Sequence, residues 1–152
     1  MRNFLSLLAL VFLCGCYSHR GYSWPSYDLS KPGWRVWNGQ AIWQPRKSIP
    51  ELTGDVMVAV NTNGNAIVQF SKTIPFATAR LDGRRWQIEF PAGNRLYSGQ
   101  YPLPAHFAWL QLPAVAEGMP PSTPWVEEGN LDQWQIVNRG AGETLRGYLS
   151  AP

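Results

Sequence analysis

Alternation of apolar and polar residues runs through the middle of the chain and predicts β-strands there. Its clearest case is 84–90, where Trp86, Ile88 and Phe90 fall on one face of an extended chain and polar residues on the other. The same period predicts further strands at 55–61, 66–70, 76–81, 95–98, 133–138 and 144–149. The segment 34–44 fits either a first strand or a short helix.

Turn residues separate these strands and predict hairpins. Asn63-Gly64 favours a type I′ turn, because both central residues of that turn need positive φ. Asp82-Gly83 marks a second hairpin, and residues 139–142 turn the chain before the last strand. Consecutive strands are therefore expected to pair antiparallel.

The segment 102–115 departs from period two and predicts one short helix. Pro104 suits the first helical position, and Phe107, Trp109 and Leu110 form an apolar face before Pro113 ends the helix. The pattern as a whole predicts a mainly β (α+β) fold. We expect a curved antiparallel meander, or incomplete β-barrel, of six to seven strands with this helix covering its concave face.

The first sixteen residues form a targeting segment. Arg2 precedes an apolar run, 4–13, that is too short to span a bilayer. Leu13 lies three residues before Cys16 and Gly15 directly before it, which resembles the lipobox of bacterial lipoproteins. The resemblance implies that residues 1–15 are removed and that Cys16 is acylated, with palmitate for example, and becomes the N-terminus.

This resemblance has consequences for location. Acyl chains anchor a protein to membranes, since each buried methylene adds about 0.8 kcal/mol. An Asp after the acylated Cys favours retention in the inner membrane, and this chain has Tyr17 there. We therefore expect a monomer anchored to the outer membrane of a Gram-negative cell, on its periplasmic face. No cysteine then remains for disulfides or thiolate metal sites.

Composition agrees with a small β domain. The chain has 8 Trp, 13 Pro and 14 Gly, and a net charge of +3 is too low to indicate nucleic acid binding. We expect a flexible tether at 16–33 and one domain at 34–152. The tether aromatics, Tyr22, Trp24 and Tyr27, fit either contact with the domain or the membrane interface.

The strand pattern also resembles the LolA/LolB family of periplasmic lipoprotein carriers and receptors. The residues that carry the likeness are the lipobox, the two hairpin turns, the Trp-Gln-Ile-Glu-Phe strand at 86–90, the segments 95–99 and 102–110, and Gln-Trp-Gln-Ile at 133–136. The likeness covers about 36–149. It implies a half-barrel of the anchored LolB type, whose hydrophobic cavity accepts acyl chains of lipoprotein cargo.

Catalytic motifs are lacking in the sequence. His106 is the only histidine of the domain, placed on the predicted helix, and the spacings of metalloproteases, hydrolases and nucleotide-binding loops do not occur. Glu127, Glu128 and Asp132 fit a solvated loop. We expect a binding protein without enzyme activity, metal or cofactor.

The inward strand residues are the candidate wall of a hydrophobic ligand site, with the helix residues as its lid. The candidates are Val58, Val68, Phe70, Trp86, Ile88, Phe90, Phe107, Trp109, Leu110 and Trp134. Arg80 and Arg95 are possible partners for an anionic headgroup. The alternative for every one of these apolar residues is a packed core, because an acyl pocket and a core have the same composition.

Two other functions remain open from the sequence. An accessory subunit of an envelope complex would have a dry core and a docking loop, for which 119–121 (Met-Pro-Pro) is a candidate. A glycan-binding module would stack sugars on exposed rings of Trp37, Trp43 and Trp125. Burial of these rings would count against the glycan function.

Overall fold

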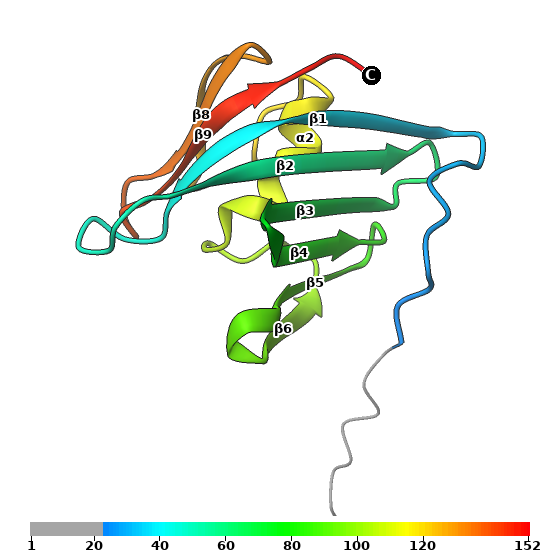
Figure 1. Ribbon diagram of the computed structural model, residues 1–152, viewed down its shortest axis with the longest axis horizontal. Helices are drawn as coiled ribbons and strands as arrows, with labels where there is room; N and C mark the ends of the chain where they lie inside the picture. Colours follow the sequence, from blue (N-terminus) through cyan, green and yellow to red (C-terminus); the bar gives the residue numbers. More distant parts are fainter. Residues whose placement is uncertain (1–22) are drawn as a thin grey trace, which may run out of the picture.

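The structure is a computed structural model that describes residues 23–152. Within this range, nine antiparallel strands form one sheet in the order β6-β5-β4-β3-β2-β1-β9-β8-β7 (Figure 1). The strands are β1 (Trp34–Gln44), β2 (Leu52–Asn61), β3 (Ala66–Lys72), β4 (Ile74–Leu81), β5 (Arg85–Phe90), β6 (Arg95–Gln100), β7 (Val126–Asn130), β8 (Gln133–Asn138) and β9 (Glu143–Leu149). The predicted mainly β, open and curved meander is confirmed, with nine strands instead of six or seven. The signal peptide and Cys16 lie outside the described residues.

The first strand joins the two parts of the sheet. β2 to β6 follow one another as a meander, and β7 to β9 form a second one. β1 pairs with β2 along ten residues and, through its second half, with β9. The backbones of β1 and β9 approach closely there. A Cβ on Gly39 would come within 1.8 Å of the carbonyl oxygen of Tyr148, and one on Gly147 within 2.0 Å of that of Gln40. Glycine is therefore required at both positions.

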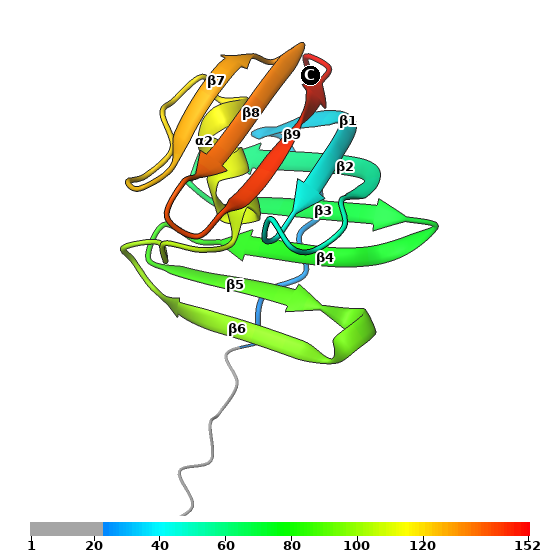
Figure 2. The same cartoon turned by 90° about the vertical axis from the view of Figure 1, so that its left-hand side faces the viewer.

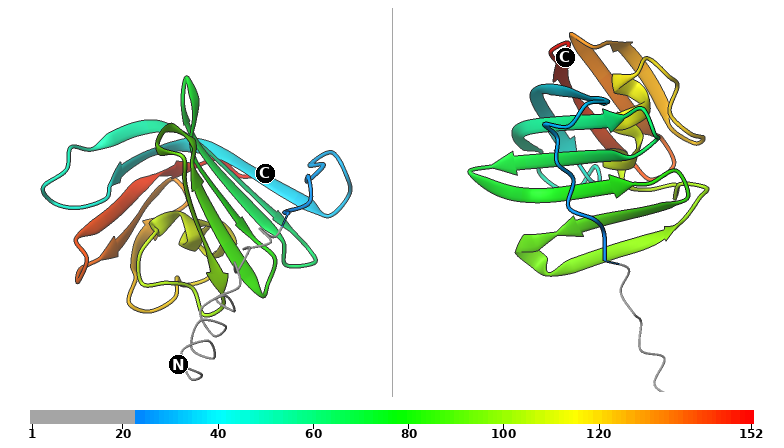
Figure 3. Two further views of the ribbon diagram at one scale, coloured as in Figure 1. Left: turned by 90° about the horizontal axis from the view of Figure 1, so that it is seen from below. Right: turned by 90° about the vertical axis from the view of Figure 1, so that its right-hand side faces the viewer.

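The concave face holds the core. Alternate residues of the central strands point inward, and Val58 of β2, Phe70 of β3 and Ile88 of β5 are almost fully buried. A 3₁₀-helix, η3 (Ala108–Gln111), and a helical turn, α2 (Leu112–Ala116), lie inside the curve of the sheet (Figures 2 and 3). Trp109 of η3 packs against Phe70 with ring centroids 4.6 Å apart. The predicted helix over the concave face is thus present.

The position of that helix differs from the prediction. It begins after Phe107 and continues to Ala116, and Pro113 lies in the first turn of α2 and does not end a helix. A proline is tolerated there because the first N–H groups of a helix have no intrahelical partner. His106 therefore precedes the helical segment, in an exposed bend.

The sequence did not predict the strand β7, and it left β1 ambiguous between a strand and a helix. The segment 34–44 is a strand, β1, because it has a partner strand on each side. At β7 the sequence predicts a solvated loop around Glu127 and Glu128, and the structure has a strand there. It has little alternation and is a strand through its pairing with β8, with Glu128 exposed and the pKa of Glu127 raised by partial burial.

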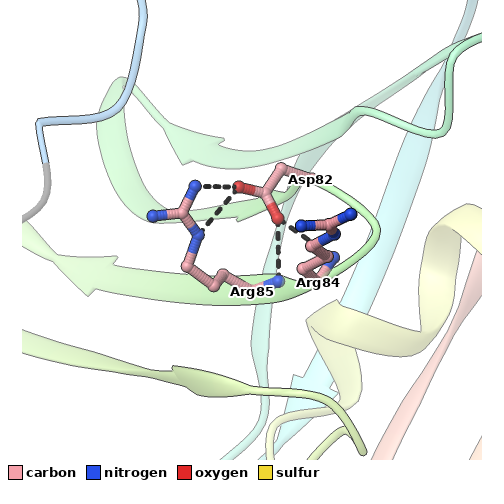
Figure 4. Close-up of polar contacts among 3 residues, drawn as sticks. All are labelled: Asp82, Arg84 and Arg85. Carbon is pink, nitrogen blue, oxygen red and sulfur yellow. Dashed lines mark hydrogen bonds and ion pairs between the residues drawn. The ribbon is translucent and has the colours of Figure 1, made fainter.

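The predicted hairpin turns are present, but one has a different type. The loop between β2 and β3 has positive φ at Gly64 (88°) and not at Asn63, so it is not the type I′ turn expected. At the β4–β5 hairpin, Gly83 has φ of 79°, and the Asp82 carboxylate accepts hydrogen bonds from the backbone N–H groups of Arg84 (3.0 Å) and Arg85 (2.8 Å) (Figure 4). The side chain of Asp82 thus fixes this turn.

The segment before β1 runs across the outer, convex face of the sheet (Figure 3). Residues 23–33 have no helix or strand. Tyr27 packs on Trp34 at 5.2 Å, and Trp24 lies in a surface hollow with side chains from β4, β5 and β6. Both aromatics therefore contact the domain, which was one of the two placements expected for them.

Candidate ligand-binding cleft

One part of the concave face is not filled by η3 and α2. A cleft of about 790 Å³ opens there, between β1, the strands β4 to β6 and the loops before η3 and β9. Its walls are mainly aromatic, formed by Trp43, Phe76, Phe90, Tyr97 and Phe107. Its volume falls within the range of small-molecule sites.

Strand positions bring the aromatic rings together. Trp43 of β1 stacks on Phe90 of β5 with centroids 5.8 Å apart. Phe76 reaches the cleft because of an irregularity in the pairing of β3 and β4. Phe70 is opposite Ala77 and Ser71 is opposite Pro75, so Phe76 has no partner in β3. An extra residue of this kind redirects side chains, and here it places the Phe76 ring 5.9 Å from Trp43.

The outer part of the cleft is formed by β6 and the loop before η3. Tyr97 is 40% exposed, and its ring centroid lies 5.0 Å from that of Phe107 and 6.3 Å from that of Phe90. Phe107 has φ of 68°, a conformation that is unfavourable for an aromatic residue. Backbone strain of this kind persists only where neighbouring contacts hold it.

A buried carboxylate supplies those contacts. Glu143 is 4% exposed and accepts hydrogen bonds from the backbone N–H groups of Phe107 (3.0 Å) and Ala108 (2.9 Å) and from the Trp43 indole (3.0 Å). Among the described residues, no cation lies within ion-pair distance of it. Three donors satisfy its charge, so Glu143 positions the wall of the cleft and the start of η3.

Basic side chains stand at the rim. Arg46 and Arg95 line the cleft and are exposed, and neither forms an ion pair with a residue in 23–152. Arg80 lies on the outer face of the sheet and pairs with Glu89 at 3.6 Å. Of the two arginines proposed from the sequence for a headgroup, the structure therefore brings only Arg95 to the cleft.

The ten candidate wall and lid residues separate into two groups. Phe90 and Phe107 line the cleft. The other eight are buried in the core, namely Val58, Val68, Phe70, Trp86, Ile88, Trp109, Leu110 and Trp134. These eight residues therefore pack in the core, which was the alternative to a ligand site.

Several residues of the cleft were not among the candidates. Tyr97 is opposite Ile88 in the sheet, so extending the inward face of β5 onto β6 would have found it. Phe76 depends on an irregularity that has no sequence signal. Glu143 follows a glycine-rich turn, and nothing local indicates that it meets Phe107, far away in sequence.

The residues expected for glycan binding do not form an exposed row. Trp37, Trp43 and Trp125 are all buried. Trp43 contributes to the cleft, but its indole N–H is taken by Glu143. The burial of the three rings counts against the glycan function.

A second opening lies at the other end of the helical segment. It measures about 640 Å³, and an ion pair joins Arg35 of β1 to Glu117, which follows α2, beside it. Tyr101 lies there, and its pKa is raised by desolvation and by the charge of Asp82. Met119, also beside this opening, is exposed.

Within residues 23–152, no helix is long and apolar enough to cross a bilayer. The same part of the chain holds no group of three or more His, Cys, Asp or Glu side chains arranged to bind a metal ion. Comparison with models of known protein families gives no match, and comparison with curated proteins gives none either.

Proposed function

We propose that this protein is an outer-membrane lipoprotein, acylated at Cys16, that binds an acyl chain or another hydrophobic ligand and helps place lipid or lipoprotein at the membrane. It acts by binding, without a covalent step. The observation that supports this function is the open aromatic cleft on the concave face, formed by Trp43, Phe90, Tyr97 and Phe107. A sheet that had only to fold would not need this part of its inner face uncovered.

The chemistry of the cleft favours a long apolar ligand. Burial of apolar surface contributes about 25 cal/mol per Å², and aromatic walls supply area with little loss of side-chain entropy. Arg46 and Arg95 at the rim suit a carboxylate or phosphate group that stays outside while the chain enters. A LolB-like receptor role fits this arrangement, with lipoprotein acyl chains as the cargo.

Native mass spectrometry of the soluble domain, with Cys16 replaced by serine and the signal peptide removed, purified from the periplasm, tests ligand binding. Fatty acids of increasing chain length should bind with an affinity that rises about fourfold per methylene until the cleft is full, because each methylene contributes about 0.8 kcal/mol. A ligand of lipid mass that copurifies would identify the class. A clean apo mass, with no uptake of fatty acid or lysolipid, would contradict the carrier function.

A matched pair of tyrosines localises the site. Tyr97→Ala removes an exposed ring from the cleft and should weaken binding. Tyr148→Ala removes a similarly exposed ring from the outer face of β9 and should leave binding unchanged. Equal effects of the two substitutions would place the ligand elsewhere.

Acylation has its own test. Labelled palmitate should be incorporated into the wild-type protein and not into Cys16→Ser, and the wild-type protein should fractionate with the outer membrane. This outcome does not depend on whether the cleft is occupied.

A role as accessory subunit of an envelope complex is the second candidate. The exposed Met119 beside the second opening favours it, since methionines are common on adaptable binding surfaces. Crosslinking from position 119 in cells would capture a defined partner if this role is correct.

A further inference from the structure

The two edges of the sheet carry opposite charge. Residues 72–100, which include β4 to β6, hold five basic side chains (Lys72, Arg80, Arg84, Arg85, Arg95) and two acidic ones (Asp82, Glu89). Residues 126–149, which include β7 to β9, hold two basic side chains (Arg139, Arg146) and three accessible acidic ones (Glu127, Glu128, Asp132), while a fourth carboxylate, Glu143, is buried in the core. We call these regions the basic edge and the acidic edge. They lie at opposite ends of the sheet order and at the bottom and top of Figure 1.

The described chain begins at the basic edge. Trp24 shares its hollow on the outer face of the sheet with Arg80, Arg95 and Leu96. Only seven peptide steps separate Cys16 from Ser23, which span at most about 25 Å. A domain of this size has a radius of gyration of about 14 Å, so this connection is shorter than the domain is wide.

We propose that the basic edge lies against a bilayer that contains anionic lipid, with the rim of the cleft at the headgroups. This inference rests on the acylation of Cys16 proposed above. An acyl anchor at that position keeps Trp24 near the bilayer, and the charge asymmetry turns the acidic edge away from an anionic surface.

The side chains at this edge suit a lipid surface. Leu96 is 58% exposed on the outer face of β6, beside Trp24. Arg95 borders both the hollow at Trp24 and the cleft. A headgroup bound by Arg95 would therefore stand at the entrance to the aromatic walls, and an alkyl chain could move between bilayer and cleft with little exposure to water.

Single-cysteine labelling of the full-length, processed protein in vesicles tests this orientation. With Cys16 acylated, the mature chain has no free thiol, so an introduced cysteine is labelled alone. A nitrobenzoxadiazole label at Leu96→Cys reports on the basic edge. The matched control, Val126→Cys, places the same label at an exposed position of β7 on the acidic edge.

In vesicles of phosphatidylethanolamine and phosphatidylglycerol, spin-labelled lipid should quench the label at position 96 several-fold more than the label at 126. The difference should shrink at high salt and in vesicles without phosphatidylglycerol. Arg84→Glu should reduce it, and the equivalent reversal at the acidic edge, Arg139→Glu, should not. Equal quenching at both positions, or stronger quenching at 126, would overturn the proposal.

Quenching at neither position would also overturn it and would leave the basic edge to an acidic protein partner. These outcomes are separate from failure of ligand binding, because the vesicles contain no added ligand and the labels lie outside the cleft. Intact mass of the same samples reports whether Cys16 is acylated, so loss of the anchor is recognised independently of orientation.

Discussion

The two halves of the concave face use the same alternating strands and have different surroundings. Over β1 to β3 and β8 to β9, the segment η3–α2 covers the inward side chains, and residues such as Val58 and Leu145 are completely buried. Beside the cleft, the segment η3–α2 does not cover the inner face of β5 and β6, and the rings of Phe90 and Tyr97 remain accessible. The helical segment is too short to fill both halves. Alternation therefore determines which face points inward, while a distant segment determines whether that face becomes core or cleft.

Trp109 is expected to show the largest effect in the filled half. It is 1% exposed and contacts both Phe70 (4.6 Å) and Trp43 (5.4 Å). Trp109→Ala leaves a large cavity and should lower the free energy of unfolding by about 3–5 kcal/mol. Urea titration followed by circular dichroism measures the loss. A change below about 1 kcal/mol would mean that the filled half is not the stable core.

Glu143 connects the two halves, since it binds the start of η3 and a wall of the cleft. Glu143→Ala leaves the indole of Trp43 and two backbone N–H groups without an acceptor, and each buried unpaired donor costs about 1 kcal/mol or more. We expect a loss of about 3 kcal/mol in the same titration. Glu128→Ala, which removes an exposed carboxylate on β7, should change stability by less than about 0.5 kcal/mol. Similar values for the two variants would show that Glu143 does not hold the halves together.

The comparison also shows how far sequence could predict this molecule. The alternation of 84–90 correctly placed Trp86 and Ile88 inside, because period two is a local property of an extended chain. It could not distinguish the buried Ile88 from the accessible Phe90 two residues later. That difference depends on where η3–α2 ends, and Pro113 gave the wrong boundary because proline both begins and interrupts helices.

The polar centre of the cleft was beyond sequence reasoning. Glu143 and Phe107 are separated by most of the C-terminal third of the chain, and their hydrogen bond depends on the β8–β9 turn meeting the loop before η3. β7 was missed for a related reason, since its polar sequence becomes a strand only beside β8. Long-range pairing decides such features, and it leaves no periodic signal.

Phe90 tests the open half of the concave face, as Trp109 tests the filled half. It touches four other rings, but one side faces the cleft. Phe90→Ala should therefore lower stability by about 1–2 kcal/mol, less than Trp109→Ala, because less apolar surface loses its contacts. The same variant should bind fatty acids more weakly. A loss of stability equal to that of Trp109→Ala would mean that the cleft is closed in solution.

The smallest expected effect lies at the β4–β5 hairpin, where local hydrogen bonds contribute more than core packing. Desolvation is the largest single influence on the pKa of Asp82 and raises it, but the backbone donors of Arg84 and Arg85 and the Arg85 guanidinium (2.9 Å) together hold the pKa below its ordinary value of 3.8 (Figure 4). A carboxyl group whose pKa is lower in the folded state stabilises that state above its unfolded pKa. This stabilisation disappears as the pH falls through the folded pKa.

Asp82→Asn should therefore lower stability at pH 7 by about 1 kcal/mol. The difference from wild type should shrink as the pH falls below 3.8 and should vanish once the pH lies below the lowered pKa of the folded state. Urea midpoints measured across this range give the result. Asp55→Asn, which removes an exposed carboxylate from β2, controls for the general loss of negative charge. A difference that persisted unchanged into strong acid would show that the carboxylate charge of Asp82 does not stabilise the hairpin. The open half would then be stabilised by packing, as the filled half is, and the two halves would differ only in how much apolar surface they bury.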